Sequence, residues 1–184
     1  RAMVVTVLDM SVVRHLHQQL EFQAVTDPLT GLLNRRGFYQ TVENLLLRGE
    51  RSDSSWVLLY LDLDGFKPIN DQYGHDAGDR FLLAISARLQ HDRREGDFIS
   101  RIGGDEFVIF GLVTGNDVSH AARALREQIY DSTRGSFDIA DTVLQYQGAS
   151  VGVVVAAPGE PMKDLLKRAD SEMYLQKKQR ASRR

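Results

Sequence analysis

The chain has 184 residues, a formal net charge of −2 at pH 7 and no cysteine, and 42% of its residues are hydrophobic. This length favours one domain with an appendage, and the apolar share is enough for a sizeable core. The composition excludes disulfides and thiolate metal sites, and it lacks the overall basic excess that would indicate a nucleic-acid partner. Without a signal peptide or an apolar run long enough to span a bilayer, the chain is expected to be cytoplasmic, although its full-length parent could be membrane-tethered.

The first 25 residues predict the end of an upstream module followed by a linker. A β-branched run at residues 4–8 indicates a short strand. Apolar residues at three- and four-residue steps between 12 and 22 indicate a linker helix. Because the chain starts at Arg1 rather than Met, in the middle of a pattern, we expect a sensory domain upstream in the full-length protein.

A buried strand is the clearest element in the next part of the chain. Residues 56–61 are almost continuously apolar, which is typical of a strand covered on both faces. A turn at 26–31 and a helix with Phe38 on its apolar face precede this strand. Residues 65–78 predict a loop with short helical potential, and an amphipathic helix is expected from there to about residue 91.

Strands and helices continue to alternate after residue 91, but with a hairpin in the middle. The predicted elements are a hairpin of strands 97–102 and 107–113, a helix capped by Asn116 and running through Tyr130, strands at 137–139 and 143–155, and a helix opened by Pro161. This order predicts an α+β fold, in which helices flank a mixed central β-sheet.

Two acids follow the buried strand directly. Asp62 and Asp64 are two residues apart, so in a strand they would share a face and emerge together at its end. The Asp-x-Asp-Gly pattern also suggests a calcium loop, but Phe66 at the fifth position and Tyr73 at the twelfth exclude one. A surface cluster of acids is a poor explanation for acids that end so apolar a strand.

The hairpin carries a second acidic pair. Gly103 and Gly104 remove side chains where something must approach the backbone, and Asp105 and Glu106 follow them. Taken alone, this is an ordinary hairpin tip with solvated acids. If its strands neighbour the buried strand, the carboxylates converge on an open shelf that suits Mg²⁺ (or Mn²⁺), which keeps waters and takes substrate phosphates. Two such ions can activate a hydroxyl and neutralise a leaving group in phosphoryl or nucleotidyl transfer.

Residues 103–107 read Gly-Gly-Asp-Glu-Phe, the signature of the GGDEF family of diguanylate cyclases. The resemblance covers about residues 26–178, with four motifs in the family's order. The other three are Asp-Pro-Leu-Thr-Gly-Leu-Leu-Asn-Arg-Arg at 27–36, Asp-Leu-Asp-Gly-Phe-Lys-Pro-Ile-Asn-Asp at 62–71 with Tyr73, His75, Gly78 and Asp79, and Ala-Asp at 169–170 with Tyr174 and Lys177.

The resemblance implies a fold related to nucleotidyl cyclases and polymerase palms. It also implies an enzyme that condenses two GTP into cyclic di-GMP, releases pyrophosphate and acts as a homodimer. The domain boundaries that it suggests are a GGDEF domain at 26–180, a basic tail at 181–184, and the upstream module and linker at 1–25, whose first strand resembles the end of a PAS-type sensor.

The resemblance also assigns roles to individual residues. Those that would hold the metal are Asp62, the Leu63 carbonyl and Asp105. Those that would act on the reacting groups are Asp105, as the proton acceptor for the ribose 3′-hydroxyl, Lys67, which stabilises charge on phosphate, and Glu106, which assists at the metal. Those that would contact GTP are Asn70 and Asp79 at the guanine, His75 nearby, Gly103 and Gly104 at the turn, and Lys177 at the terminal phosphates. A structural role for His75 is an equal alternative.

Two further features qualify the match. The family places Gly and Arg three and four residues after the closing lysine, where this chain has Arg180 and Ala181. Arg180 or the basic tail is therefore the candidate substitute for the missing phosphate contact. Arg94 and Asp97 match the family's Arg-x-x-Asp site for inhibition by cyclic di-GMP, and Arg101 could join them. A plain surface pair of Arg94 and Asp97 is the alternative.

Two other functions stay open on the sequence. One is a non-catalytic module that binds GTP or cyclic di-GMP as a receptor. The other is a cyclase with an altered substrate range that makes mixed or adenine dinucleotides.

Overall fold

The structure is a computed structural model, and it describes residues 24–47, 54–115, 117–139 and 142–182. The strand and linker helix predicted before residue 23 lie outside these residues, and the predicted domain boundaries remain predictions. None of the helices in the described part of the chain is long and apolar enough to cross a membrane.

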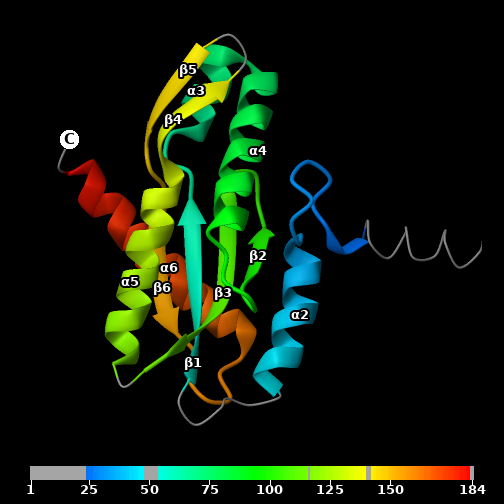
Figure 1. Cartoon of the computed structure of the whole chain (residues 1–184), viewed down its shortest axis with the longest axis vertical. Coiled ribbons are helices and arrows are strands. Elements are labelled where there is room, and N and C mark those ends of the chain that lie inside the picture. Colours follow the sequence, from blue (N-terminus) through cyan, green and yellow to red (C-terminus); the bar gives the residue numbers. More distant parts are fainter. Residues whose placement is uncertain (1–23, 48–53, 116, 140–141, 183–184) are drawn as a thin grey trace, which may run out of the picture.

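A four-stranded sheet forms the centre of the molecule, in the order β2-β3-β1-β6 (Figure 1). Neighbouring strands pair antiparallel, and an isolated parallel bridge joins Leu33 to Ser100 at the β2 edge. The strands are β1 (Ser54–Asp62), β2 (Phe98–Arg101), β3 (Glu106–Thr114) and β6 (Ser150–Val155).

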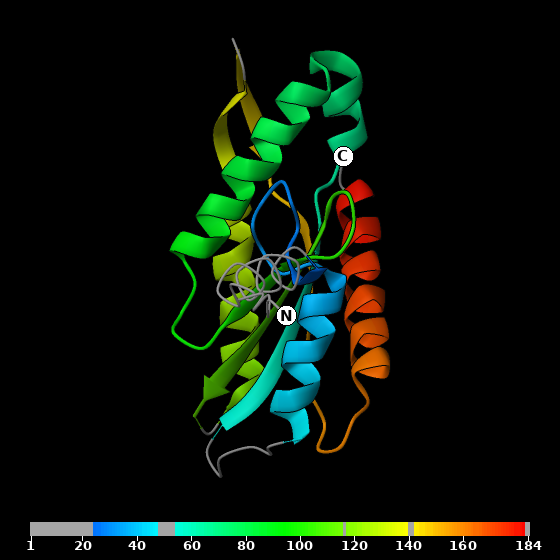
Figure 2. The ribbon, with the colours of Figure 1, turned by 90° about the vertical axis from the view of Figure 1, so that its right-hand side faces the viewer.

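Strand β1 is buried on both faces because helices cover both sides of the sheet. Val57, Leu59 and Leu61 face one core cluster with residues of α4 and α5, and Leu58 and Tyr60 face a second with residues of α2 and α6. Figure 2 shows the sheet between these two helix layers. The helices are α2 (Arg35–Leu47), α4 (His75–His91), α5 (Val118–Thr133) and α6 (Met162–Ala181).

Beyond one end of this sheet lie α3 (Phe66–Tyr73) and a separate hairpin of β4 (Arg134–Ile139) and β5 (Thr142–Gln147) (Figure 1). Phe81 of α4 joins the hairpin to the helices, because its ring centroid lies 5.0 Å from that of Phe137 and 4.9 Å from that of Tyr146. Arg88 adds a polar clamp, since its guanidinium lies 3.7 Å above the Phe137 ring and donates to the carbonyls of Arg134 and Ser136. The α3–α4 pair is thereby fixed to the hairpin.

Three local predictions need correction. The loop predicted at 65–78 is wrong: most of it is helix, with α3 between the left-handed residues Gly65 and Gly74, and α4 starting directly afterwards. The strand predicted at 143–155 is two strands, because Gly148 turns the chain at φ 91° between β5 and β6. The cap of α5 is Asp117, whose side chain accepts from the N–H of His120, while Asn116 lies outside the described residues.

Helix α6 packs unusually close to the sheet at Gly152. A Cβ on this residue would lie 2.3 Å from the carbonyl oxygen of Ala169 and 2.3 Å from the backbone nitrogen of Met173. Both contacts are helix backbone, which cannot move aside as a flexible side chain would.

We therefore expect Gly152→Ala to destabilise the domain by about 1–3 kcal/mol, the usual cost of overpacking a dense core. Urea unfolding monitored by circular dichroism measures this loss. Gly104→Ala is the matched control for stability, because a Cβ there meets nothing within 4 Å. Equal stability of Gly152→Ala and the wild type would show that α6 shifts without cost.

Candidate active site

The register between β1 and β3 brings the two acidic segments together. Asp62, the last residue of β1, lies opposite Glu106, the first residue of β3. One residue further, the N–H of Leu63 donates to the carbonyl of Asp105 over 3.0 Å, and the N–H of Ile102 closes the turn onto the carbonyl of Glu106 over 3.0 Å. The two backbones thus hold the acids side by side at one end of the sheet.

The surroundings of Asp105 disfavour the charged form of its carboxyl group. Partial burial raises its pKa above the ordinary value, and the negative charge of Asp62 raises it further. Its own backbone N–H and the charges of Lys177 and Arg101 act in the opposite direction but do not cancel the shift. Two carboxylates that repel each other in this way are relieved when a cation binds between them.

Helix α6 brings two cations to the acids that follow β1. The ammonium of Lys177 lies 2.7 Å from Asp62 Oδ1, and the guanidinium of Arg180 lies 3.2 Å from Asp64 Oδ2. Ser150 of β6 also donates to Asp64 Oδ2, over 2.7 Å. Burial opposes the charge on Lys177, but the hydrogen bond to Asp62 and the nearby acids outweigh it, so the pKa of Lys177 is raised. The acids and the end of α6 thus form one charged cluster.

Glu106 points to the face of the sheet that α2 and α6 cover. The hydroxyl of Tyr60 donates to Glu106 Oε1 over 3.0 Å, and burial together with this carboxylate raises the pKa of Tyr60. A Cβ on Gly103 would lie 2.3 Å from Glu106 Oε2, so a side chain at this position would displace the carboxylate from its present place. Tyr60 and Gly103 therefore fix the orientation of the second acid of the turn.

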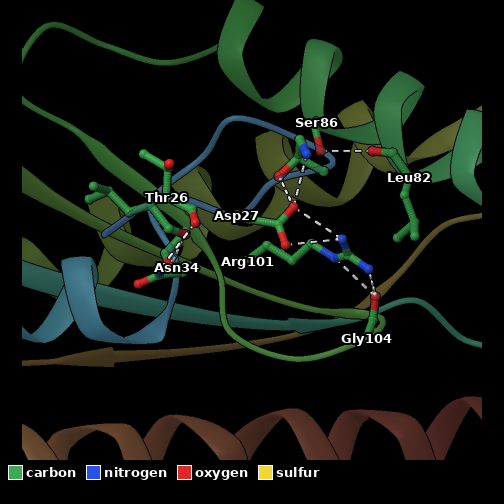
Figure 3. A network of polar contacts seen from close by, with 10 residues as sticks. Thr26, Asp27, Asn34, Leu82, Ser86, Arg101 and Gly104 are labelled. Carbon is green, nitrogen blue, oxygen red and sulfur yellow. Dashed lines mark hydrogen bonds and ion pairs between the residues drawn. The ribbon is translucent and has the colours of Figure 1, made fainter. Parts of the chain in front are cut away.

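Arg101 secures the glycine turn to the start of the domain (Figure 3). Its Nη1 lies 3.1 Å from Asp27 Oδ1, and its Nε and Nη2 donate to the carbonyl of Gly104 over 3.1 and 2.8 Å. Thr30 also donates to Asp27. Burial opposes ionisation of Asp27, but the hydrogen bonds from Thr30 and the charge of Arg101 prevail, and the pKa of Asp27 is lowered.

The residues predicted to contact the base lie on α3 and α4. Asn70 of α3 sits against Gly78 of α4 so closely that a Cβ on Gly78 would lie 1.8 Å from Asn70 Oδ1. That oxygen is buried and has no hydrogen-bond partner among the described residues. Asp79 follows Gly78, and both it and His75 are exposed, as is Lys67 on the first turn of α3. The structure thus places Asn70 against the turn of α4 that carries Asp79.

The predicted inhibitory pair has an asymmetric structure. Asp97 is buried, its Oδ2 accepts from the backbone N–H of Arg94 over 3.0 Å, and a Cβ on Gly111 would lie 2.3 Å from its Oδ1. The guanidinium of Arg94 is exposed and donates to Gln128 over 3.3 Å. Arg101, at the opposite end of β2, does not join them, because its guanidinium is occupied by the turn contacts described above.

The oxygen donors at the end of β1 fit a magnesium ion. Asp62 and Asp105 supply hard oxygens, and the pKa of Asp105 stays raised by burial and by Asp62 even though Lys177 and Arg101 oppose the shift. The Leu63 carbonyl accepts from the N–H of Phe66 over 3.1 Å, which leaves one lone pair. No cluster of three or more His, Cys, Asp or Glu side chains suited to a metal occurs among the described residues. A magnesium ion held by these oxygens would keep further coordination positions for water and substrate phosphates.

The family model for the diguanylate cyclase GGDEF domain matches residues 24–183. The chain belongs to the GGDEF diguanylate cyclase family. Among curated relatives it is similar to the diguanylate cyclase DgcP of Escherichia coli strain K12, with 38% identity over 167 residues, which are 90% of this chain and 48% of DgcP. The chain thus spans about half the length of the curated relatives it matches.

Solved structures of GGDEF proteins have the same fold. A sensory box/GGDEF family protein from Caulobacter crescentus is 33% identical with a TM-score of 0.77, over 84% of this chain and 99% of that one. The coiled coil and GGDEF domain of DgcB from Caulobacter crescentus, in complex with c-di-GMP, is 26% identical with a TM-score of 0.78, over 92% of this chain and 89% of that one. The predicted α+β GGDEF fold is confirmed.

The sequence did not single out Tyr60, which holds Glu106. It did single out Asp64, but not the contacts by which Asp64 links α6 to β6. Extending the period of two backwards from Asp62 and Asp64 would have reached Tyr60, because the three alternate along one chain segment. The contact between Asp27 and Arg101 could not be predicted from the sequence, because the two residues are 74 positions apart and no local pattern relates them.

Burial of Asp97 predicts a specific dependence of stability on pH. Burial raises its pKa, so the folded protein binds this proton more tightly than the unfolded chain. The contribution of Asp97 is therefore fully present below the ordinary aspartate pKa and is lost as pH rises through the raised value. Asp97→Asn removes this dependence while its amide oxygen can still accept from Arg94.

Urea unfolding at several pH values between about 3 and 7 brackets the ordinary aspartate pKa and tests this point. The stability of Asp97→Asn relative to the wild type should increase as pH rises and then level off. Asp138→Asn, at an exposed position of β4, is the control. A constant difference across this range would contradict the assignment.

Proposed function

We propose that this GGDEF domain is an active diguanylate cyclase that condenses two GTP into cyclic di-GMP and releases pyrophosphate. The observation that carries the proposal is the β1–β3 register, which sets Asp62 opposite Glu106 and ties Leu63 to Asp105. This arrangement gathers acids at a glycine turn that leaves room for a nucleotide. The reaction would be magnesium-dependent, would require a dimer and would be inhibited by its product.

The metal ligands in this proposal are Asp62, the Leu63 carbonyl and Asp105. When bound, the metal would lower the cost of charge on the reacting oxygens and on the pyrophosphate leaving group. The side chain of Lys177 now pairs with Asp62, so this ammonium is positioned to exchange its carboxylate partner for the terminal phosphates. Lys67, exposed on the first turn of α3, is the second candidate for charge stabilisation on phosphate.

Asp105 is the proton acceptor. The ribose 3′-oxygen of one GTP attacks the α-phosphorus of the other, its proton passes to Asp105, and the bond to pyrophosphate breaks. The same step with the roles exchanged closes the ring, so two GTP give one cyclic di-GMP and two pyrophosphates. The place of Asp105 in the turn beside Asp62 puts its carboxylate where the reacting hydroxyl would meet the metal ligands.

Asn70 and Asp79 would select guanine. A carboxylate can accept from both N1–H and the amino group of guanine, a pair of donors that adenine does not offer. The buried Asn70 oxygen without a partner adds an acceptor whose desolvation cost is already met in the free protein. A site of this kind rejects the base that leaves its polar groups unpaired. His75, exposed at the start of α4, would lie beside the nucleotide.

Each protomer would bind one GTP, so the reacting groups meet only when two domains face each other. Feedback would come from cyclic di-GMP bound at Arg94 and Asp97. The exposed guanidinium of Arg94 is suited to a phosphate or a guanine edge. Buried Asp97 would act mainly by holding the backbone of Arg94 in place.

Asp105→Asn should abolish formation of cyclic di-GMP, because an amide can neither take the proton nor supply its charge to the metal. Liquid chromatography with mass spectrometry of reactions with GTP and Mg²⁺ measures the product, and calorimetry with GTP verifies binding. Wild-type protein that binds GTP and forms no product at high protein concentration would favour the receptor function instead. Reactions with mixed GTP and ATP identify any adenine-containing dinucleotide.

Arg94→Ala should let cyclic di-GMP accumulate to a higher level than the wild type, because a product-binding group is lost. Initial rates measured before product accumulates should stay within about twofold, since surface substitutions far from the reacting groups change little. Arg93→Ala, the exposed neighbour, is the matched control. Identical progress curves for Arg94→Ala and the wild type would exclude feedback through this residue.

A further inference from the structure

Arg180 occupies the one position of the closing motif at which this chain carries a large charged residue in place of the family's glycine. We propose that Arg180 is a positioning residue: its guanidinium fixes the last turns of α6 to the β5–β6 turn and to Asp64, and so holds Lys177 over Asp62. It is not a phosphate ligand. The inference deepens the proposed cyclase function and rests on it.

Both terminal nitrogens of the half-buried Arg180 guanidinium contact the protein. Nη1 donates to the carbonyl of Ala149 over 2.5 Å and Nη2 to the carbonyl of Gln147 over 2.8 Å. Nη1 also lies 3.2 Å from Asp64 Oδ2, and the guanidinium carbon lies 5.0 Å from the Tyr130 ring centroid. The planar guanidinium of an arginine has several N–H donors in a fixed arrangement, so it can bind all these groups at once. The ammonium of a lysine cannot.

These contacts matter because α6 has little else to hold its end. Met173 is the last of the buried residues of α6, and the helix continues to Ala181. Helix ends without buried apolar contacts open readily. In the last two turns, Lys177 and Arg180 are the residues that reach the acidic cluster. Since they are three residues apart, they share a helix face. Contacts that hold Arg180 therefore also hold the helix turn from which Lys177 extends.

The surface that Arg180 contacts is held in place by other interactions. Tyr130 of α5 donates to the carbonyl of Gln147 over 3.0 Å, and a Cβ on Gly148 would lie 2.7 Å from the Tyr130 ring. Asp64 is held from the other side by Ser150. The β5–β6 turn and Asp64 thus form one binding surface for the guanidinium, and the contacts of Arg180 with this surface set the position of the last turns of α6.

A double-mutant cycle on Arg180 and Lys177 tests the proposal. The probe is 3′-deoxy-GTP with Mg²⁺, which cannot react, and the readout is its dissociation constant by calorimetry. If Arg180 acts through Lys177, Arg180→Ala weakens binding about tenfold in the wild type but less than about twofold in Lys177→Ala, the signature of coupled residues. If Arg180 binds phosphate itself, the two losses multiply, and the proposal is overturned.

Two further variants separate positioning from charge and from folding. Arg180→Lys keeps the positive charge but lacks the planar guanidinium, so this variant should bind the probe as weakly as Arg180→Ala. Binding at the wild-type level by Arg180→Lys would overturn the proposal. Lys178→Ala, which removes a neighbouring charge stacked on Tyr174, should bind as the wild type does.

Hydrogen exchange provides the readout that does not involve nucleotide. Amides of residues 175–181 should exchange faster in Arg180→Ala, with core strands unchanged, whereas unchanged exchange throughout contradicts the proposal. If the wild type does not bind 3′-deoxy-GTP, both the proposed function and this inference are contradicted. If the wild type binds it and the affinity losses of the two single variants multiply in the double variant, only this inference is contradicted.

Discussion

The antiparallel pairing of β1 with β3 is the constraint on which the rest of the site depends. A register shift of one residue would turn the side chains of β1 to opposite faces, and the two core clusters, packed around different side chains on each face, would both be disrupted. The observed register places Asp62 opposite Glu106. The position of the acids is therefore decided by the burial of leucines and valines several residues away, and not by the acids themselves.

Around this pairing, polar contacts from distant segments orient each functional group. Arg101 ties the carbonyl of Gly104 to Asp27, and Tyr60 holds Glu106. Lys177 and Arg180 bring α6 to the two acids that follow β1. Buried charge networks are weak sources of stability, because desolvation opposes their attraction. Their value here lies in fixing directions: a carboxylate with a defined partner has one orientation rather than several.

Much of this arrangement could be read from the sequence, and the misses have physical causes. The apolar run before Asp62 predicted a buried strand with acids at its end, since burial on two faces removes the polar alternation. The loop predicted at 65–78 failed because only Ile69 of α3 is buried, so helical periodicity was absent. The contact of Arg180 with Asp64 joins positions 116 residues apart through the packing of α6, which no local pattern encodes.

Asn70 has a consequence for the energetics of the free domain. Its buried amide oxygen meets no donor in the described structure, pressed into a space that only glycine at position 78 leaves open. A buried acceptor that has lost its hydrogen bonds to water and gains none in the protein lowers the stability of the ligand-free protein. A ligand whose donor reached this oxygen would recover that loss as affinity and would raise the melting temperature as its concentration rose. A thermal shift caused by a nucleotide would then report in part on whether Asn70 had gained a donor.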